Sequence, residues 1–346
     1  MTDAVAVLLI VAVTAYAVLA GADFGAGFWD LLAGVADRGE RPRALIEHSI
    51  GPVWEANHVW LIFTLVMLWT AFPPAFASIT STLFVPLTLA AFGIVLRGAS
   101  FAFRKSVVRT RDRRNFGAAF AASSVITPYC MGAVAGAIAS GRVPSGGTTG
   151  DPWSSWVNVT SVVAGVLAVA TCAFLAAVFL IRDAARLEQH DLAEYFRRRA
   201  IAAAIAAGAA AVAGIFVLGA DATYVFHGMA SRSLPLVVAS AMCGVTSLVL
   251  LRRGIARFAR LVAVGAVATI VFAWGVAQWP YILPTSLKVS AAAAPSETLT
   301  ALLVVFAIAV AVIGPSIALL FVMDQRSLLP EEGAERAEKP PAPVPS

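Results

Sequence analysis

Residues 4–29 read AVAVLLIVAVTAYAVLAGADFGAGFW, an apolar run that contains a single charged residue, Asp23. A helix needs about 20 predominantly apolar residues to cross the hydrocarbon core of a bilayer, and this run is longer than that. Its apolar residues are continuous, whereas a strand of a membrane barrel alternates apolar and polar residues. The run therefore predicts a transmembrane α-helix.

Similar runs recur along the whole chain. Of its 346 residues, 60% are hydrophobic and 13% are charged, and the mean hydropathy is +0.84. Soluble domains are about 45–50% apolar and about 25% charged, so the composition argues against a soluble enzyme, a disordered protein and a disulfide scaffold. We predict an all-α fold, a polytopic membrane helical bundle of about nine transmembrane helices. The predicted spans are 4–29, 50–71, 78–103, 115–140, 155–181, 200–219, 233–251, 260–279 and 299–323.

The connections between these spans alternate in charge. Of the 25 Lys and Arg residues, 21 lie in the odd-numbered connections and the C-terminal tail, if Arg260 at the start of the eighth span is counted with the connection before it. Three lie in the even-numbered connections, and Arg97 lies inside the third span. Cytoplasmic loops carry the excess of Lys and Arg, so we predict an outer N-terminus and a cytoplasmic C-terminus. This asymmetry accounts for the net charge of +5 without a nucleic-acid partner. Residues 1–324 are predicted to form one transmembrane domain, followed by a disordered cytoplasmic tail over 325–346.

Three ionisable residues lie inside the first three spans, where a charge is costly: Asp23, Glu55 and Arg97. Each is seven residues from a polar residue at the cytoplasmic end of its own span. In the first span this residue is Asp30, and in the third span it is Arg104. At 1.5 Å per residue, all three groups lie about 10 Å inside the cytoplasmic edge. Two carboxylates and one guanidinium therefore share one depth.

Two interpretations of this cluster follow from the residues alone. A carboxyl in a low-dielectric site can exchange protons near neutrality, which suits a proton path from the cytoplasm. In that case Arg97 holds one carboxylate ionised while the other carries the proton. Alternatively, the cluster is a structural ion pair that locks three helices together. The pattern by itself favours neither interpretation.

Two polar residues, Asn57 and His58, follow Glu55 in the second span. An imidazole can ligate haem or a metal ion, but no second ligand stands at helical spacing. We therefore interpret His58 as a hydrogen-bonded polar side chain and predict no metal site. In the first span, Gly21 and Gly25 form a face of small residues, and Gly25 and Gly27 thin the helix further, which predicts close helix–helix approach.

Three sequence blocks carry a resemblance to a known family. Residues 21–27 read GADFGAG, residues 51–60 read GPVWEANHVW, and residues 96–104 read LRGASFAFR. Together they resemble subunit II of the cytochrome bd quinol oxidases, and the resemblance extends from Val5 to about Asp324. The sequence departs from the family pattern at Glu55, where Asp is common, at Ala56, where Gly is usual, and at His58, where Glu or Gln is usual. The motif residues outside the charge cluster are Gly21, Gly25, Gly27, Gly51, Pro52, Trp54, Trp60 and Arg104.

The resemblance implies a function and a set of partners. Subunit II would form a heterodimer with a haem-bearing subunit I in the cell membrane of a prokaryote, and the complex would oxidise quinol and reduce oxygen to water. Subunit I would carry two haems b, one haem d and the quinol site. Subunit II would bind no haem with its own ligands and would support proton uptake. In some members it holds a structural quinone. Membrane lipid would surround the complex. Whether a small accessory subunit also belongs to it is left open.

A proton-coupled secondary transporter is the alternative function. Intramembrane Asp, Glu and Arg side chains near broken helices also fit that class. Against it, the charges gather in the first three spans near one membrane face, and not at a midplane between repeats. The depth of Asp23 and Glu55 on the cytoplasmic side agrees with the proton uptake that the resemblance implies, and this agreement favours the proton-path interpretation.

Overall fold

The computed structural model describes residues 1–34, 37–50, 54–106, 110–146 and 148–325. For some residues in its helices the backbone is described but the side chain is not: 37–38, 50, 54–56, 101–106, 110–116, 256, 313, 317–318, 320–321 and 324–325. The chain divides into two compact units, Met1–Leu299 and Thr300–Ser346. The prediction of one transmembrane domain over 1–324 stays a prediction. The predicted disordered tail falls almost wholly on residues 326–346, which lie outside the described part of the chain.

Helices make up almost all of the described chain, and one small hairpin is the exception. The helices before residue 160 are α1 (Thr2–Leu31), α2 (Asp37–Ile50), α3 (Trp54–Ala71), α4 (Pro73–Thr82), α5 (Phe84–Ser106), α6 (Thr110–Ala139) and α7 (Val159–Arg186). The later elements are α8 (His190–Asp221), α9 (Thr223–Ala230), α10 (Leu234–Arg252), α11 (Ala256–Gln278), β1 (Tyr281–Leu283), β2 (Leu287–Lys288), α12 (Val289–Ala292) and α13 (Ser296–Gln325).

The predicted membrane helical architecture is confirmed. The predicted spans overlap mainly with α1, α3, α5, α6, α7, α8, α10, α11 and α13. The span predicted at 78–103 begins too early, because residues 78–82 belong to α4 and α5 begins only at Phe84. Within the described residues, seven helices are long and apolar enough to cross a membrane, and up to eight if the bent pair of α3 and α4 forms one span. The apolar part of α5, Phe84–Ser100, is shorter. The count of nine crossings and the sides on which the termini lie stay predictions.

Helix α7 is the centre of the first unit, where it packs against α1, α6, α8 and α11. Small residues make these contacts possible. A Cβ atom added at Gly132 of α6 would lie 2.6 Å from the carbonyl oxygen of Ala164, and one added at Gly136 would lie 2.6 Å from the Cα atom of Ser161. Lipid tails are as apolar as leucine side chains, so close backbone packing is a main source of helix association in a membrane.

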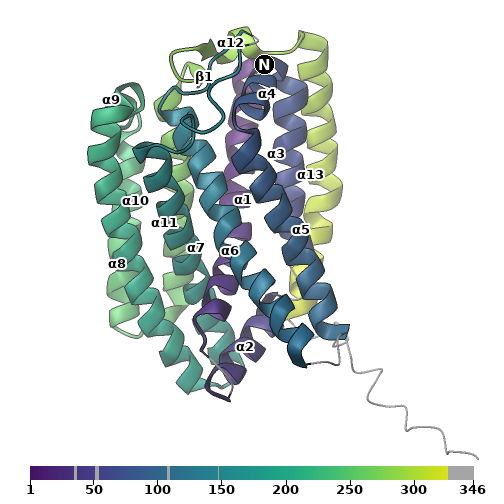
Figure 1. Cartoon of the computed structure of the whole chain (residues 1–346), viewed down its shortest axis with the longest axis vertical. Coiled ribbons are helices and arrows are strands. Elements are labelled where there is room, and N and C mark those ends of the chain that lie inside the picture. The colour runs from purple at the N-terminus through teal and green to yellow at the C-terminus, as the bar shows by residue number, and fades with distance from the viewer. Residues whose placement is uncertain (35–36, 51–53, 107–109, 147, 326–346) are drawn as a thin grey trace, which may run out of the picture. The chain divides into compact units, whose positions relative to one another are not determined.

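The short elements of the first unit gather at one end. Figure 1 shows α4, α9, β1 and α12 at the end where the chain begins, and α2 at the opposite end. The helical path from α3 into α4 bends by 117° at the break before Pro73, which stands in the first turn of α4. Strands β1 and β2 pair antiparallel, with Tyr281 opposite Lys288 and Leu283 opposite Leu287.

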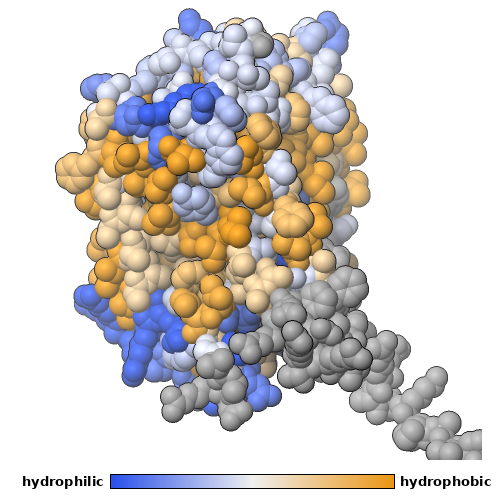
Figure 2. Space-filling model, in the orientation of Figure 1, coloured by the Kyte–Doolittle hydropathy of each residue, from blue (hydrophilic) through white to orange (hydrophobic). Residues whose placement is uncertain are grey.

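The surface of the first unit matches a membrane environment. Figure 2 shows hydrophobic residues over the middle of the first unit and hydrophilic residues towards its two ends, outside the parts drawn in grey. Large apolar side chains such as Phe216, which is 75% exposed, lie on this surface. A soluble protein rarely exposes apolar patches of this extent. The chain is therefore a multi-pass membrane protein.

Candidate functional site

The intramembrane charges meet in one buried ion pair. Arg97 of α5 donates through Nη2 to the Oδ1 atom of Asp23, at 2.7 Å, and to the Asp23 carbonyl oxygen, at 2.8 Å. Arg97 is 2% exposed and Asp23 is 5% exposed. The pair therefore joins α1 to α5 in surroundings where an uncompensated charge would be strongly destabilising.

A third helix completes the surroundings of the guanidinium. Through its Nη1 atom Arg97 also donates to the hydroxyl oxygen of Ser124 in α6. That hydroxyl in turn donates to the carbonyl oxygen of Phe120, at 2.6 Å. The guanidinium carbon lies 4.3 Å from the ring centroid of Phe120 and 5.1 Å from that of Phe24. The guanidinium thus contacts two aromatic rings, one carboxylate oxygen, one carbonyl oxygen and one hydroxyl.

Glycines of α1 provide the space for this arrangement. A Cβ atom at Gly27 would lie 2.8 Å from the Nη1 atom of Arg97 and closer still to the Ser124 hydroxyl. A Cβ atom at Gly25 would overlap the carbonyl group of Cys172 in α7. At Gly21 the nearest atom would be a side-chain carbon at 3.4 Å, which is ordinary contact. Close approach therefore depends on Gly25 and Gly27, and much less on Gly21.

A second acid of α1 lies two turns from Asp23. The carboxylate of Asp30 is buried and lies 3.3 Å from the Nε atom of Arg43 in α2, which is partly exposed. Arg43 also donates to the carbonyl oxygen of Gly34. The first helix thus carries two acid–arginine pairs, one in its interior and one near the end at which α2 lies.

The described residues of the second motif lie next to the first helix. Asn57 is buried, and the imidazole of His58 packs edge-on against Tyr16 and Phe24, with centroid distances of 6.4 and 6.1 Å. Trp60 packs against the cluster that contains Tyr16 and Phe24. The interpretation of His58 as a hydrogen-bonded polar side chain stays a prediction, and so does its role.

Several predicted site residues lie outside the described part of the chain. Gly51 and Pro52 lie in the undescribed segment 51–53. Trp54 and Glu55 stand in the first turn of α3 and Arg104 stands in the last turn of α5, but their side chains are not described. The structure therefore supplies no contacts for Glu55.

Two buried oxygens near the ion pair have no hydrogen-bond partner among the described groups. One is the Oδ2 atom of Asp23 and the other is the hydroxyl of Tyr16, two turns away on the same helix. Buried polar atoms are almost always hydrogen-bonded, to protein or to ordered water. The side of Asp23 that faces away from Arg97 therefore has the capacity to accept a further hydrogen bond.

The structure adds residues that sequence reasoning missed. Ser124, Arg43 and Tyr16 all lie beside the predicted cluster, but none was singled out. Ser124 belongs to the Ser123-Ser124 pair inside an apolar span, which was the available signal. Arg43 is one of several arginines in its connection, and Tyr16 resembles any aromatic residue of a span. Sequence spacing does not distinguish Arg43 or Tyr16 from similar residues nearby.

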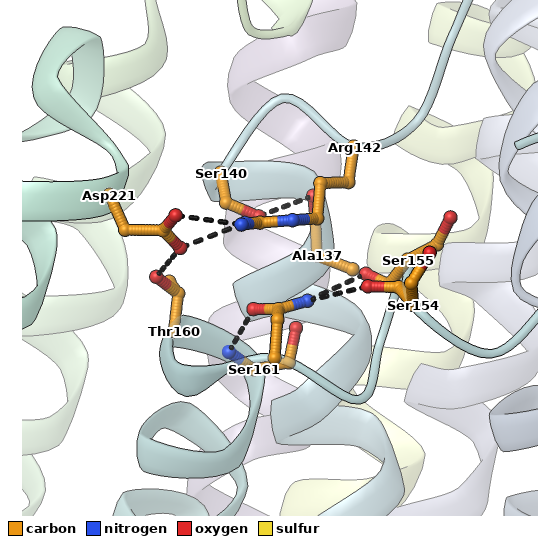
Figure 3. A network of polar contacts seen from close by, with 9 residues as sticks. Ala137, Ser140, Arg142, Ser154, Ser155, Thr160, Ser161 and Asp221 are labelled. Atoms are coloured by element: carbon orange, nitrogen blue, oxygen red, sulfur yellow. Dashed lines mark hydrogen bonds and ion pairs between the residues drawn. The ribbon is translucent and has the colours of Figure 1, made fainter. Parts of the chain in front are cut away.

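A separate polar network lies at the end of the first unit opposite α2. Figure 3 shows Arg142, in the connection between α6 and α7, forming two hydrogen bonds with Asp221 at the end of α8, at 2.7 and 2.8 Å. The hydroxyl of Thr160, in the first turn of α7, donates to the same carboxylate. The hydrogen bonds between Arg142 and Asp221 raise the pKa of the Arg142 guanidinium above its ordinary value. The network ties three helix ends together and is partly exposed, which is typical of a structural contact.

The described part of the chain also contains an apolar groove, and it offers no candidate metal centre. Among those residues, no group of three or more His, Cys, Asp or Glu side chains could hold a metal ion. A groove of about 430 Å³ lies between α1, α6, α7 and α8, and apolar and aromatic side chains such as Phe28, Val125 and Val169 line it. Its lining suits a hydrocarbon chain and offers no acid or base.

Comparison with known proteins agrees with the motifs. The family described as "Cytochrome bd terminal oxidase subunit II" matches residues 1–323. The chain is 25% identical over 250 residues to "Cytochrome bd ubiquinol oxidase subunit 2" of Bacillus subtilis, covering 71% of each chain. It is 25% identical over 314 residues to "Cytochrome bd-I ubiquinol oxidase subunit 2" of Escherichia coli, covering 80% of each.

The fold is also similar to a solved structure. A chain of the bd oxidase from Geobacillus thermodenitrificans superposes with a TM-score of 0.73 at 23% identity, over 92% of this chain and 97% of that one. At this level of identity the likeness speaks for the fold alone.

Proposed function

Because the chain belongs to the cytochrome bd terminal oxidase subunit II family, we propose that it acts as the second subunit of a membrane complex that oxidises quinol and reduces oxygen to water. Its partner is a haem-bearing subunit I, with which it forms a heterodimer. The match over residues 1–323 is the observation that carries this proposal. Family membership favours the oxidase subunit over the proton-coupled transporter.

The chemistry of oxygen reduction belongs to the partner subunit in this proposal. The haems, two of type b and one of type d, supply electron transfer and oxygen reduction when bound there. The described residues of this chain include no group of side chains suited to a metal. The apolar groove beside α1 suits the tail of a structural quinone or a lipid acyl chain, and the structural quinone stays a prediction.

We further propose that this subunit carries protons from the cytoplasm, and that its two intramembrane acids have different roles. Arg97 donates to both the carboxylate and the carbonyl oxygen of Asp23. An opposite charge at hydrogen-bond distance favours the ionised form of an acid. Asp23 is therefore the fixed anion of the path, and its Oδ2 atom is free to accept a hydrogen bond from a proton-bearing group.

Glu55 is then the group that exchanges protons. It stands in the first turn of α3, two residues before the buried Asn57 and next to Trp54 in sequence. Helix α3 packs against α1, which carries Asp23 and Asp30. A path that enters at Asp30 would thus pass the anion at Asp23 on its way to Glu55. An acid whose neighbours in the sequence, Val53 and Trp54, are apolar suits this exchange.

The competing role for the cluster is structural. The Arg97–Asp23 pair links α1 to α5 and, through Ser124, to α6, so a lock between three helices needs no proton transfer. The two roles differ in what Glu55 does. A lock made by Arg97 and Asp23 does not require Glu55 to ionise, whereas a proton path does.

The test replaces Glu55 by Gln in the intact complex. The change keeps the shape and the hydrogen bonding but removes the exchangeable proton. The measurement is oxygen consumption per haem, taken from neutral to alkaline pH. We expect a Glu55→Gln complex that assembles with its haems but consumes oxygen about 100-fold more slowly, the low end of the contribution of a positioned acid or base. Glu55→Asp should keep partial activity.

A matched control is Glu297→Gln, which makes the same chemical change at an exposed glutamate of α13. It should leave turnover per haem unchanged. Wild-type turnover per haem in Glu55→Gln at every pH would remove Glu55 from the proton path. Joint loss of haem and complex in Glu55→Gln, with normal turnover in the complex that survives, would support the structural lock instead.

A further inference from the structure

The turn between α10 and α11 carries a concentration of exposed cations. Arg252 ends α10, Arg253 follows it, and Arg257 lies in the first turn of α11. All three side chains are exposed. Gly254, with a φ of +74°, allows the chain to reverse between the two helices. The reversal places three guanidinium groups within six residues at the end of the first unit where α2 lies (Figure 1).

No acid within this part of the chain balances these cations. The sequence contains no Asp or Glu from Ala222 to Ser296, a stretch that includes all of α10 and α11. Among the described residues, Arg252, Arg253 and Arg257 take part in no ion pair. The positive charge of the turn therefore has no partner within the described chain.

The acids of the neighbouring helices are already engaged. Glu194 of α8 accepts from Arg197, at 2.6 Å, and from Arg198, at 2.9 Å. Arg197 also donates to the carbonyl oxygen of Leu251, at 3.1 Å, which brings α8 beside the end of α10. Asp183 of α7 faces Arg260 of α11, together with Arg182 and Arg186. None of these acids is left over for the turn.

Helix electrostatics explain only part of the cluster. Arg252 stands in the last turn of α10, where the helix dipole favours a cation. Arg257 stands in the first turn of α11, where the dipole disfavours one. An anion placed between the two helix ends would stabilise Arg257 and interact favourably with the start of α11. The position of Arg257 is thus disfavoured by the dipole of α11 alone and would be favoured with an anion bound.

Apolar side chains continue directly from the cations. Ile255, Phe258 and Leu261 are 42%, 55% and 72% exposed. Arg257 lies over the edge of its neighbour Phe258, with 5.8 Å between the guanidinium carbon and the ring centroid. A soluble anion would not require such neighbours. A phospholipid would, because its phosphate and its acyl chains need polar and apolar contacts side by side.

We propose that the α10–α11 turn is a binding site for an anionic phospholipid, with the phosphate between Arg252, Arg253 and Arg257 and the acyl chains along Phe258 and Leu261. The positive-inside prediction places this turn on the cytoplasmic side, where anionic headgroups attract basic segments. The site is separate from the buried Arg97–Asp23 pair, and the proposal does not depend on the proton path.

The test uses the purified intact complex after lipid removal in a neutral detergent. The complex is titrated with dioleoyl phosphatidylglycerol or dioleoyl phosphatidylcholine in mixed micelles, and bound lipid is counted by native mass spectrometry. A photoactivatable phosphatidylglycerol then locates the contact by peptide mapping. We expect preferential retention of the anionic lipid and cross-links within residues 249–261. Equal retention of the two lipids, or cross-links only elsewhere, would overturn the proposal without any variant.

Variants measure the contribution of the arginines. Each cation near an anionic surface contributes roughly a fivefold gain in affinity. Arg253→Gln should therefore weaken phosphatidylglycerol binding about fivefold, and the triple Gln variant on the order of 100-fold. The matched control is Arg198→Gln, which removes an exposed cation that is paired with Glu194; it should change binding less than twofold. If a triple Gln variant does not assemble, the triple Lys variant, which keeps the charge, must still prefer the anionic lipid. Equal effects of Arg253→Gln and Arg198→Gln would indicate general charge attraction and refute the site.

Discussion

Replacing Arg97 by Met tests the buried ion pair directly. Methionine keeps most of the side-chain volume between Phe24 and Phe120 but removes the guanidinium. Asp23 loses both hydrogen bonds from Arg97, and Ser124 loses its contact with the same group. The variant therefore isolates the loss of charge from the loss of packing.

The cost follows from the burial of the pair. Without Arg97, the Asp23 carboxylate remains buried without its ion-pair partner. Breaking a buried ion pair by removing one partner typically costs about 3–5 kcal/mol.

The measurement is the midpoint of thermal unfolding of the assembled complex, by fluorescence-detected size exclusion. At about 2–4 °C per kcal/mol for domains of 150–250 residues, we expect a drop of about 10 °C. The double variant Asp23→Asn/Arg97→Met should be more stable than Arg97→Met alone, because the unpaired buried carboxylate is gone. A midpoint within about 2 °C of wild type in Arg97→Met would refute the buried-pair reasoning.

Three further predictions concern packing, the polar network and topology. Gly25→Ala should destabilise the complex by about 1–3 kcal/mol, because the new methyl group overlaps the backbone of Cys172, whereas Gly21→Ala, with ordinary contacts, should be tolerated in the same melting experiment. Arg142→Ala should cost only about 1 kcal/mol, because its ion pair with Asp221 is about 30% exposed; a larger loss would mean that the network in Figure 3 carries more than a surface contact. A cysteine at position 106, in the most basic connection, should resist impermeant thiol reagents in sealed right-side-out vesicles, and labelling there would reverse the predicted orientation.

The sequence by itself determined the class of fold and predicted a common depth for the intramembrane charges. Hydropathy is a local property that adds up along each run, so continuous apolar stretches identify helices without knowledge of their neighbours. The same logic places Asp23 and Arg97 at one depth, because helix rise converts residue number into distance. The three motif blocks at residues 21–27, 51–60 and 96–104 together were sufficient to indicate the family. None of these inferences requires a contact between helices.

Only the tertiary structure decided which groups touch. Arg97 had two candidate carboxylates at the same depth, and the structure pairs it with Asp23 and adds Ser124 from a third helix. The structure also shows that a Cβ atom at Gly25 would overlap the backbone of α7, whereas a Cβ atom at Gly21 would make ordinary contacts. These outcomes depend on how each helix is rotated about its axis and how closely it approaches its neighbours. Rotation and approach are set by side-chain packing across helices far apart in the sequence, which neither hydropathy nor spacing within one helix encodes.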